Sequence, residues 1–196
     1  MTLMSRSNRE RTEQTRQALI DAGRRIFVET GYAETATPEI VAAAGVTRGA
    51  LYHHFEDKKA LFQAVIECEA REVAKAIEAS PLPADDPRAA LIAGASAYFT
   101  AMAQPGRTRL LLMEAPAVLG LPAVAALDAE NAEASLRAGL AALVPEAGAA
   151  LLGPLTSLLS AAFDRAAIAI EAGGERRDYE QAIAALLDGL ADHLRR

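Results

Sequence analysis

The sequence predicts an all-α protein, and three observations support this fold class. Alanine, the strongest helix former, accounts for 46 of the 196 residues, whereas the β-branched residues valine and isoleucine together account for 17. Apolar residues recur at helical spacing along most of the chain. Helix-start signals, in which a capping side chain precedes proline, occur at Thr37-Pro38 and Asp86-Pro87.

The N-terminal part of the chain predicts four helices in succession. The first ends at Gly31, because glycine tolerates the left-handed conformation of a helix C-cap. The second is capped by Thr37 and ends at Gly45, the third is capped by Thr47, and the fourth is capped by Asp57. The expected helices span residues 10–30, 38–44, 48–55 and 58–79.

The remainder of the chain predicts helices separated by prolines and glycines. Residues 80–87 contain three prolines and predict a loop, after which Asp86 caps the next helix. The prolines between Pro105 and Pro122 predict a short helix and a turn. Pro154 lies near the start of the penultimate helix and either kinks it or marks its first turn. The expected helices span residues 87–103, 122–143, 151–170 and 179–194.

Charge and composition exclude several classes of protein. The net charge of −6 divides into +1 for residues 1–60 (nine Lys/Arg, eight Asp/Glu) and −7 for residues 61–196 (11 and 18). This acidity argues against non-specific coating of nucleic acid or anionic membranes. With one cysteine and three histidines, the chain is expected to form no intramolecular disulfide, no cysteine-rich zinc site and no histidine-built metal centre, and no cofactor is expected. The single cysteine, Cys68, is expected to be a small buried hydrophobe.

The sequence also lacks the patterns typical of enzymes, membrane proteins and secreted proteins. We find no nucleophile–base motif and no glycine-rich phosphate loop, so no enzymatic activity is expected. No apolar run is expected to reach the 18–20 residues of a membrane span, and the polar N-terminus lacks the apolar core of a secretory signal. The expected location is therefore the cytoplasm.

Residues 31–62 form the motif that carries functional information. Two short helices are joined by a tight turn at residues 44–46, where Gly45 supplies the positive φ that the turn requires. This is the layout of a helix-turn-helix, whose second helix enters the DNA major groove. The apolar residues spaced to form its core are Ile40, Val41, Val46, Leu51 and Phe55.

The second helix of this motif supplies the candidate DNA contacts. Its first turn presents backbone N–H groups and the hydroxyl of Thr47 to phosphate, and Arg48 can donate to guanine or phosphate. Tyr52 can donate its hydroxyl to phosphate. The alternative to DNA contact is that these side chains are only solvated residues of an exposed helix and helix caps. The predicted DNA-binding residues are Thr37, Thr47, Arg48, Gly49, Ala50, Tyr52, His53 and Lys58.

The motif resembles the N-terminal domain of the tetracycline-repressor (TetR) family of bacterial transcriptional regulators. The resemblance spans about 50 residues, and Ala36 departs from it, because the family often has a hydroxyl residue there. The matching residues are Gly31-Tyr32, Thr35, Ile40, Ala43-Ala44-Gly45-Val46, Gly49, Leu51-Tyr52, His54-Phe55, Lys58 and Leu61-Phe62.

The resemblance implies a homodimer of about nine helices per chain that binds a palindromic operator and is released by a small-molecule inducer. Residues 1–57 would form the DNA-binding domain, and residues 58–196 the ligand-binding and dimerisation domain. The family pairs its last two helices with those of a second copy. The apolar stripes here then place the interface at Leu155, Leu158, Leu159, Ala162, Ile183, Leu186, Leu187 and Leu190.

The C-terminal part carries less specific information. Its largest apolar side chains either line a ligand pocket or fill the core, and Glu114 either pairs with Arg107 or Arg109, binds a cationic ligand, or lies at the surface. Alternative functions are a helical small-molecule carrier or enzyme, and an adaptor that uses its last two helices. The predicted pocket residues are Tyr98, Phe99, Met102, Met113, Glu114 and Phe163.

Overall fold

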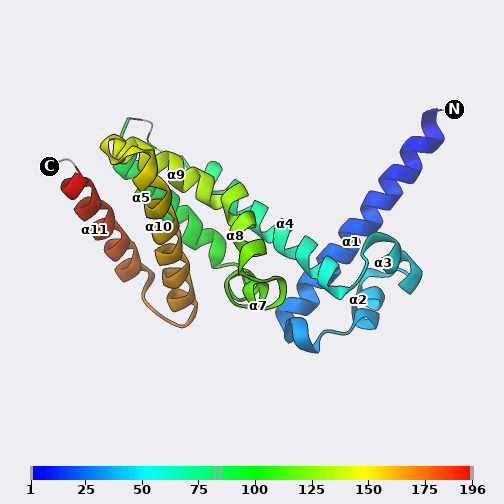
Figure 1. Cartoon of the computed structure of the whole chain (residues 1–196). Coiled ribbons are helices and arrows are strands. Elements are labelled where there is room, and N and C mark those ends of the chain that lie inside the picture. Colours follow the sequence, from blue (N-terminus) through cyan, green and yellow to red (C-terminus); the bar gives the residue numbers. More distant parts are fainter. Residues whose placement is uncertain (1, 82, 84, 195–196) are drawn as a thin grey trace.

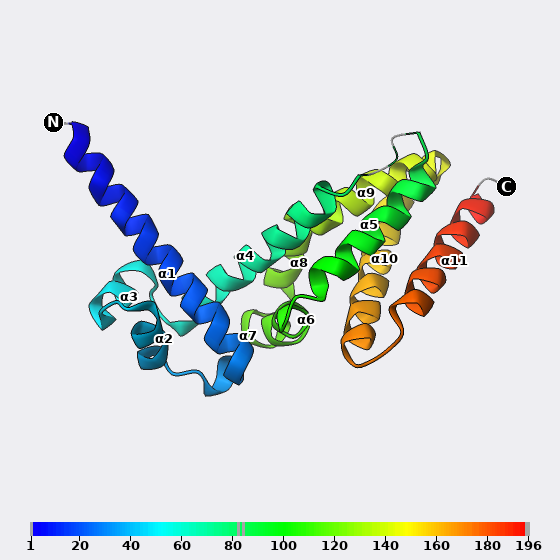
Figure 2. The same ribbon diagram turned by 180° about the vertical axis from the view of Figure 1, so that it is seen from behind.

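The computed structural model describes residues 2–81, 83 and 85–194, with side chains from residue 9 onward. Every regular element in these residues is a helix, which confirms the all-α prediction. Figure 1 shows a unit of three helices near the N-terminus, joined by a long helix to a larger layer that ends at the C-terminus. The N-terminal end of the first helix projects away from both parts (Figures 1 and 2).

The N-terminal unit consists of α1 (Thr2–Glu34), α2 (Thr37–Ala44) and α3 (Arg48–His54). Gly31, with a φ of 81°, interrupts the helical geometry of α1 at the residue predicted to end it. Gly45, with a φ of 65°, ends α2 in a left-handed cap and turns the chain towards α3, as predicted. The side chains expected to form the helix-turn-helix core are buried or pack against the same cluster: Ile40, Val41, Val46, Leu51 and Phe55.

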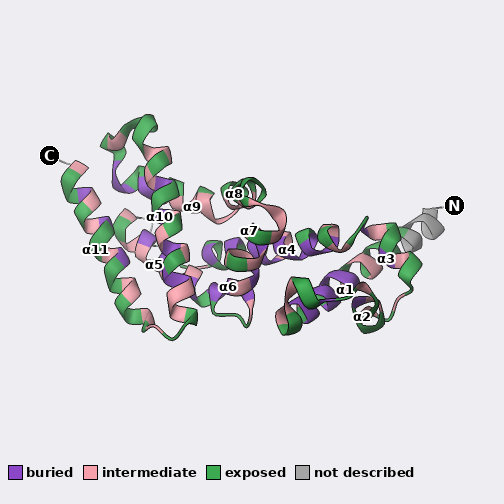
Figure 3. Cartoon of the chain, turned by 60° about the horizontal axis from the view of Figure 1, so that its bottom comes forward, coloured by how far each residue is buried: buried purple, intermediate pink, exposed green. Residues whose placement is uncertain are grey.

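Helix α4 (Lys58–Glu78) belongs to both cores of the molecule. Its first half, including Leu61 and Val65, packs with α1–α3, while Val73 and Ile77 pack in the C-terminal core. The two cores therefore divide this helix along its length. The N-terminal core therefore continues past residue 57 into α4, and Figure 3 shows the buried residues along this helix.

In the C-terminal layer α4 packs against α5 and α9, α10 packs against α9, and α11 lies outermost against α5 and α10 (Figure 1). Among the described residues, counting the uninterrupted run 107–119 as one helix gives ten helices, against about nine expected. The elements are α5 (Pro87–Met102), α6 (Arg107–Arg109), the π-helix η1 (Leu110–Glu114), α7 (Ala115–Leu119), α8 (Leu121–Glu130), α9 (Ala132–Leu143), the 3-10 turn η2 (Pro145–Ala147), α10 (Gly148–Glu171) and α11 (Arg176–Leu194).

Several predicted helix bounds are wrong. Helix α1 starts at Thr2 rather than near residue 10, because no glycine or proline interrupts the polar N-terminal segment. The helix expected over 122–143 breaks at Asn131, whose side chain donates to the carbonyl of Leu127 at 2.6 Å. Helix α10 begins at Gly148, so Pro154 lies inside it and does not mark its first turn.

The segment Pro145–Glu171 is long and apolar enough to span a membrane by length and composition, with a mean hydropathy of 1.3 over its best 18-residue window. The expectation that no apolar run approaches a membrane span is therefore wrong. In this fold the segment packs one face into the C-terminal core through Leu159, Phe163 and Ala166. Although 17% of that window is buried, exposed residues such as Leu151 and Leu158 leave part of the segment uncovered by the single chain.

Gly106 is a position where we expect a substitution to destabilise the fold. Its φ is 74°, and a Cβ atom there would lie 2.6 Å from a methyl carbon of Val28 on α1. Gly106→Ala is therefore expected to lower the free energy of unfolding by about 1–3 kcal/mol in chemical denaturation. Gly94→Ala, in an open position of α5, is the control and is expected to be neutral or stabilising. Equal stability of the two variants would contradict close packing of this turn on α1.

Candidate nucleic-acid interface and internal cavity

The first turn of α3 is exposed and held in place by a side-chain cap. The hydroxyl of Thr47 accepts a hydrogen bond from the backbone N–H of Ala50 at 3.1 Å, as the predicted cap requires. Thr47, Arg48 and Gly49 are exposed, while Leu51 is fully buried beneath them. The buried leucine therefore fixes which face of α3 points to solvent.

Tyr52 joins the exposed faces of α2 and α3. Its side chain is 43% exposed, and hydrogen bonds from the Thr37 and Arg48 side chains lower the pKa of its hydroxyl. The Arg48 guanidinium carbon also lies 5.5 Å from the centroid of the Tyr52 ring. The structure thus gathers three predicted DNA contacts into one polar cluster that spans both helices.

Thr37 does not cap α2, contrary to prediction. The N-cap is Ala36, whose backbone N–H is satisfied by the Glu39 side chain at 3.3 Å. Thr37 is instead the first residue of α2, so its hydroxyl is available to Tyr52. The departure noted at Ala36 therefore changes the local hydrogen bonding and leaves the start of α2 in place.

The two histidines of α3 differ in exposure. His53 is exposed, and its ring centroid lies 5.3 Å from that of His54. His54 is half-buried, and burial, followed by the charges of His53 and Arg16, lowers the pKa of its imidazole. Of the pair, only His53 is freely presented on the outer face.

The ammonium group of Lys58 has hydrogen-bond partners within the fold. It donates to the carbonyl oxygens of Tyr32 and Thr35 at 2.8 and 2.9 Å, with a longer contact to Ala33 at 3.4 Å. It also lies 4.4 Å from the centroid of the Tyr32 ring. The helix-end carbonyls beyond Gly31 accept from all three ammonium hydrogens, so the predicted phosphate contact would require Lys58 to release one of these carbonyls.

A cavity with a volume of about 340 Å³ lies in the C-terminal layer. Two neighbouring residues of η1, Leu111 and Leu112, form part of its wall. Of the six predicted pocket residues, three line it: Tyr98, Met102 and Phe163.

The other three predicted pocket residues lie elsewhere. Phe99 is buried in the core, with its ring centroid 6.0 Å from that of Phe163. Met113 lies on the π-helical turn and is exposed. Glu114 lies near α1 and belongs to a different contact.

Two side chains near η1 hold the C-terminal end of α1. Arg109 donates to the carbonyl oxygens of Phe27 and Val28 at 2.8 and 2.7 Å. Glu114 accepts a hydrogen bond from the backbone N–H of Tyr32 at 2.8 Å. It also pairs with Arg109 at 3.1 Å, although that contact is too poorly aligned to be a hydrogen bond. Of the roles considered for Glu114, pairing with Arg109 is the one observed.

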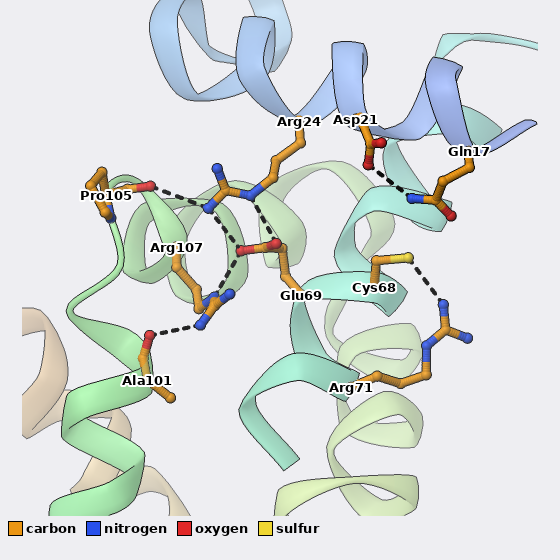
Figure 4. A network of polar contacts seen from close by, with 9 residues as sticks. All are labelled: Gln17, Asp21, Arg24, Cys68, Glu69, Arg71, Ala101, Pro105 and Arg107. Atoms are coloured by element: carbon orange, nitrogen blue, oxygen red, sulfur yellow. Dashed lines mark hydrogen bonds and ion pairs between the residues drawn. The ribbon is translucent and has the colours of Figure 1, made fainter. Parts of the chain in front are cut away.

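A second contact between the two parts is centred on Glu69 of α4 (Figure 4). This buried carboxylate accepts hydrogen bonds from Arg24 of α1 and Arg107 of α6, each at 2.8 Å. Burial raises the pKa of Glu69, but the hydrogen bonds from the two arginines outweigh it and the net shift is downward. Cys68 beside it is half-buried and accepts a 3.1 Å contact from Arg71.

The predicted dimer residues fall into two groups. Leu159, Ile183 and Leu187 are buried in the chain's own core, with Leu187 at 0% exposure, so they cannot form a surface seam without unfolding. Leu158 and Leu186 are 70% and 53% exposed. Leu155, Ala162 and Leu190 are half-buried. Helices α10 and α11 run antiparallel, as predicted (Figures 1 and 2).

Two family models match the chain. Residues 19–65 match bacterial regulatory proteins of the tetR family, and residues 88–194, more than half of the 196-residue chain, match the tetracyclin repressor-like C-terminal domain. The chain belongs to the TetR family. That family consists of regulatory proteins rather than enzymes, in agreement with the sequence prediction.

Individual TetR-family relatives agree with this assignment. The HTH-type transcriptional regulator AcrR of Shigella flexneri is 44% identical over 64 residues, which cover 33% of this chain and 30% of AcrR. The repressor BepR of Brucella suis is 46% identical over 63 residues, which cover 32% and 30%. The matched segment therefore spans less than a third of these curated relatives. A TetR-family crystal structure from Pectobacterium atrosepticum is 32% identical and covers 95% of this chain and 96% of that one, with a TM-score of 0.69.

Two charged residues inside this TetR-family chain, Glu69 and Asp164, were not predicted from the sequence. Glu69 lies four residues from both Val65 and Val73 on the buried stripe of α4, which is the signal that could have identified it. Asp164 directly follows Phe163 of the α10 core and lines the cavity. A carboxylate inside an apolar helical stripe was therefore the informative pattern.

Proposed function

We propose that this protein is a ligand-responsive transcriptional repressor that acts in the cytoplasm. A dimer would bind a palindromic operator through residues 1–57, and a small-molecule inducer in residues 58–196 would release it. The observation that carries DNA binding is the cluster of exposed Arg48 and Tyr52 with half-buried Thr37 on a helix-turn-helix. Such a helix reads the major groove, and a dimer places two of them about 34 Å apart.

The connection between the cavity and α1 supports release by a ligand. Leu111 and Leu112 line the cavity, and Arg109 and Glu114 on either side of them bind the C-terminal end of α1. A ligand that displaces the two leucines would shift η1, and therefore move α1 with its helix-turn-helix. π-Helical turns within helices are frequent at functional sites. In a dimer, a small change in the spacing of the two α3 helices lowers operator affinity.

The test is a fluorescence-anisotropy titration of DNA from upstream of the gene, with scrambled DNA as control. We expect two chains to bind each palindrome, with an affinity that falls as salt rises because phosphate contacts release counterions. Binding equal to that of scrambled DNA would overturn the proposed function. A helical carrier or an adaptor would give that result.

Removing the Tyr52 hydroxyl is expected to weaken operator binding. Tyr52→Phe keeps the ring and removes the group that pairs with Thr37 and Arg48. One lost hydrogen bond to phosphate corresponds to about a 10-fold loss of affinity. Tyr179→Phe on α11 is the matched control and is expected to bind as the parent does. If the two variants bind equally well, Tyr52 does not contact the operator.

A further inference from the structure

The walls of the internal cavity are mainly apolar. Ile66, Val73 and Ile77 of α4 line one side, and Leu111 and Leu112 of η1 line another. A volume of about 340 Å³ lies within the range of small-molecule sites, which begins near 300 Å³. A cavity of this kind accommodates the apolar body of an organic ligand.

The charged groups of the cavity all have the same sign. Among the described lining residues there are three carboxylates, Asp128 of α8, Glu133 of α9 and Asp164 of α10, and neither lysine nor arginine. The Tyr98 hydroxyl donates to Asp164 at 2.6 Å. Within the described part of the chain, the Asp128 carboxylate has no hydrogen bond or ion pair. The cavity therefore carries negative charge that no protein cation balances.

The unbalanced carboxylates are unfavourable for the protein when no ligand is bound. Burial, followed by the charges of Asp164 and Glu133, raises the pKa of Asp128 to about 6. Burial also raises the pKa of Asp164, although the hydrogen bond from Tyr98 opposes it. At neutral pH, ionised Asp128 is therefore partly desolvated and repelled by its neighbours. A bound cation would relieve both costs at once.

We infer that the cavity binds a lipophilic organic monocation, with its charged group beside Asp128 and Asp164 and its apolar body against α4 and η1. The described residues hold no cluster of three or more His, Cys, Asp or Glu side chains that could bind a metal ion, so a metal is not the expected cation. The inference rests on the proposed function, because it gives the chemical class of the inducer for the same cavity.

The test compares ions of similar shape and opposite charge. Isothermal titration calorimetry at pH 7.5 would measure binding of tetraphenylphosphonium and tetraphenylborate to the full chain without DNA, with benzyltrimethylammonium as a smaller cation. We expect at least one of the cations to bind about 10-fold or more tightly than the borate, since opposite charges attract strongly at low effective dielectric. If neither cation shows this preference, the inference is wrong.

Isosteric variants test the assigned carboxylates. Asp128→Asn and Asp164→Asn keep the side-chain shape, and the asparagine oxygen at 164 still accepts from Tyr98. Each is expected to weaken binding of the preferred cation about 10-fold or more. Glu130→Gln removes the same charge from an exposed position of α8 and is expected to change affinity less than about 2-fold. An equal effect of Asp128→Asn and Glu130→Gln would overturn the assignment.

The pH dependence gives a second readout of Asp128. The groups around it are Asp164, Glu133 and Tyr98, and Asp128 ionises as the pH rises through about 6. Affinity for the permanent cation is therefore expected to increase from pH 5 to 7.5, and to increase less in Asp128→Asn. A parallel increase in both proteins would contradict the role of Asp128.

The two proposals fail in different ways. If the protein binds its operator but prefers no cation, the inducer class is wrong and the proposed function stands. If the protein prefers the cation but binds no upstream DNA, the proposed repressor function is wrong and the cavity assignment stands. If both hold, adding the preferred cation is expected to lower operator affinity by about 5-fold or more, the usual lower limit of such coupling.

Discussion

Glu69→Gln is expected to lower the free energy of unfolding by about 3 kcal/mol, the lower end of the range for removing one partner of a buried ion pair. The change leaves Arg107, which is almost fully buried, without its counter-ion. It also removes the charge that holds Arg24, whose side chain is one-third exposed and can recover some hydration. Chemical denaturation at pH 7 measures the loss.

The control for Glu69→Gln is Glu72→Gln, one turn further along α4. Glu72 pairs with Lys75 at 2.8 Å, but both side chains are exposed. An exposed pair of this kind contributes less than about 1 kcal/mol, so a small effect is expected. If the two variants were equally stable, Glu69 would not be the centre of the contact between α1, α4 and α6.

The stability difference between the parent and Glu69→Gln is also expected to depend on pH. The arginines hold the pKa of Glu69 below its usual value of 4.5 in the folded chain. The stabilisation is therefore complete above about pH 4.5 and is lost as the pH falls through the lowered folded pKa. Denaturation at pH 7, 5 and 3.5 is expected to show the two proteins converging at the lowest pH. A constant difference would mean that the effect is not electrostatic.

Local patterns explain why much of the fold could be predicted from the sequence. The start of α3 depends on Thr47 and Gly45, and the stripes of α4 depend on residues three or four positions apart, so both are visible within a short window. The break at Asn131, where the side chain bonds to the carbonyl of Leu127, and the π-helical turn at 110–114 occur without a glycine or proline at the irregular residues. They leave no such local signal.

The residues of the candidate site also differ in how far their roles follow from nearby residues in the sequence. Exposed contacts such as Arg48 and Tyr52 follow from helical periodicity once Leu51 is recognised as buried. The contacts of Lys58 with the carbonyls of Tyr32 and Thr35, and of Glu114 with the backbone of Tyr32, do not, because these partners lie 23–26 and 82 residues away in the chain. Leu187 satisfies an apolar stripe as well as Leu186 does, yet only the three-dimensional packing shows that one is core and the other is exposed.

This distinction determines the variant that tests the proposed dimer. Leu187→Glu would place a charge in the core and unfold the chain, so it cannot report on an interface. Leu158→Glu and Leu186→Glu instead alter the exposed faces of α10 and α11, which the single chain leaves uncovered. Large exposed apolar faces of this kind mark interaction sites. The change therefore tests association while leaving the core intact.

The Leu158→Glu/Leu186→Glu double variant is expected to sediment as a monomer, and the parent is expected to sediment as a dimer. Its operator affinity is expected to fall by about 100-fold or more, because each chain then binds one half-site without the effective concentration that the second chain provides. Leu121→Glu makes the same change at an exposed leucine of α8 and is expected to remain dimeric. If the double variant stays dimeric with unchanged helicity, the interface lies on another face. If it is monomeric but binds the operator as tightly as the parent, dimerisation through α10 and α11 is not what aligns the two copies of α3 on DNA.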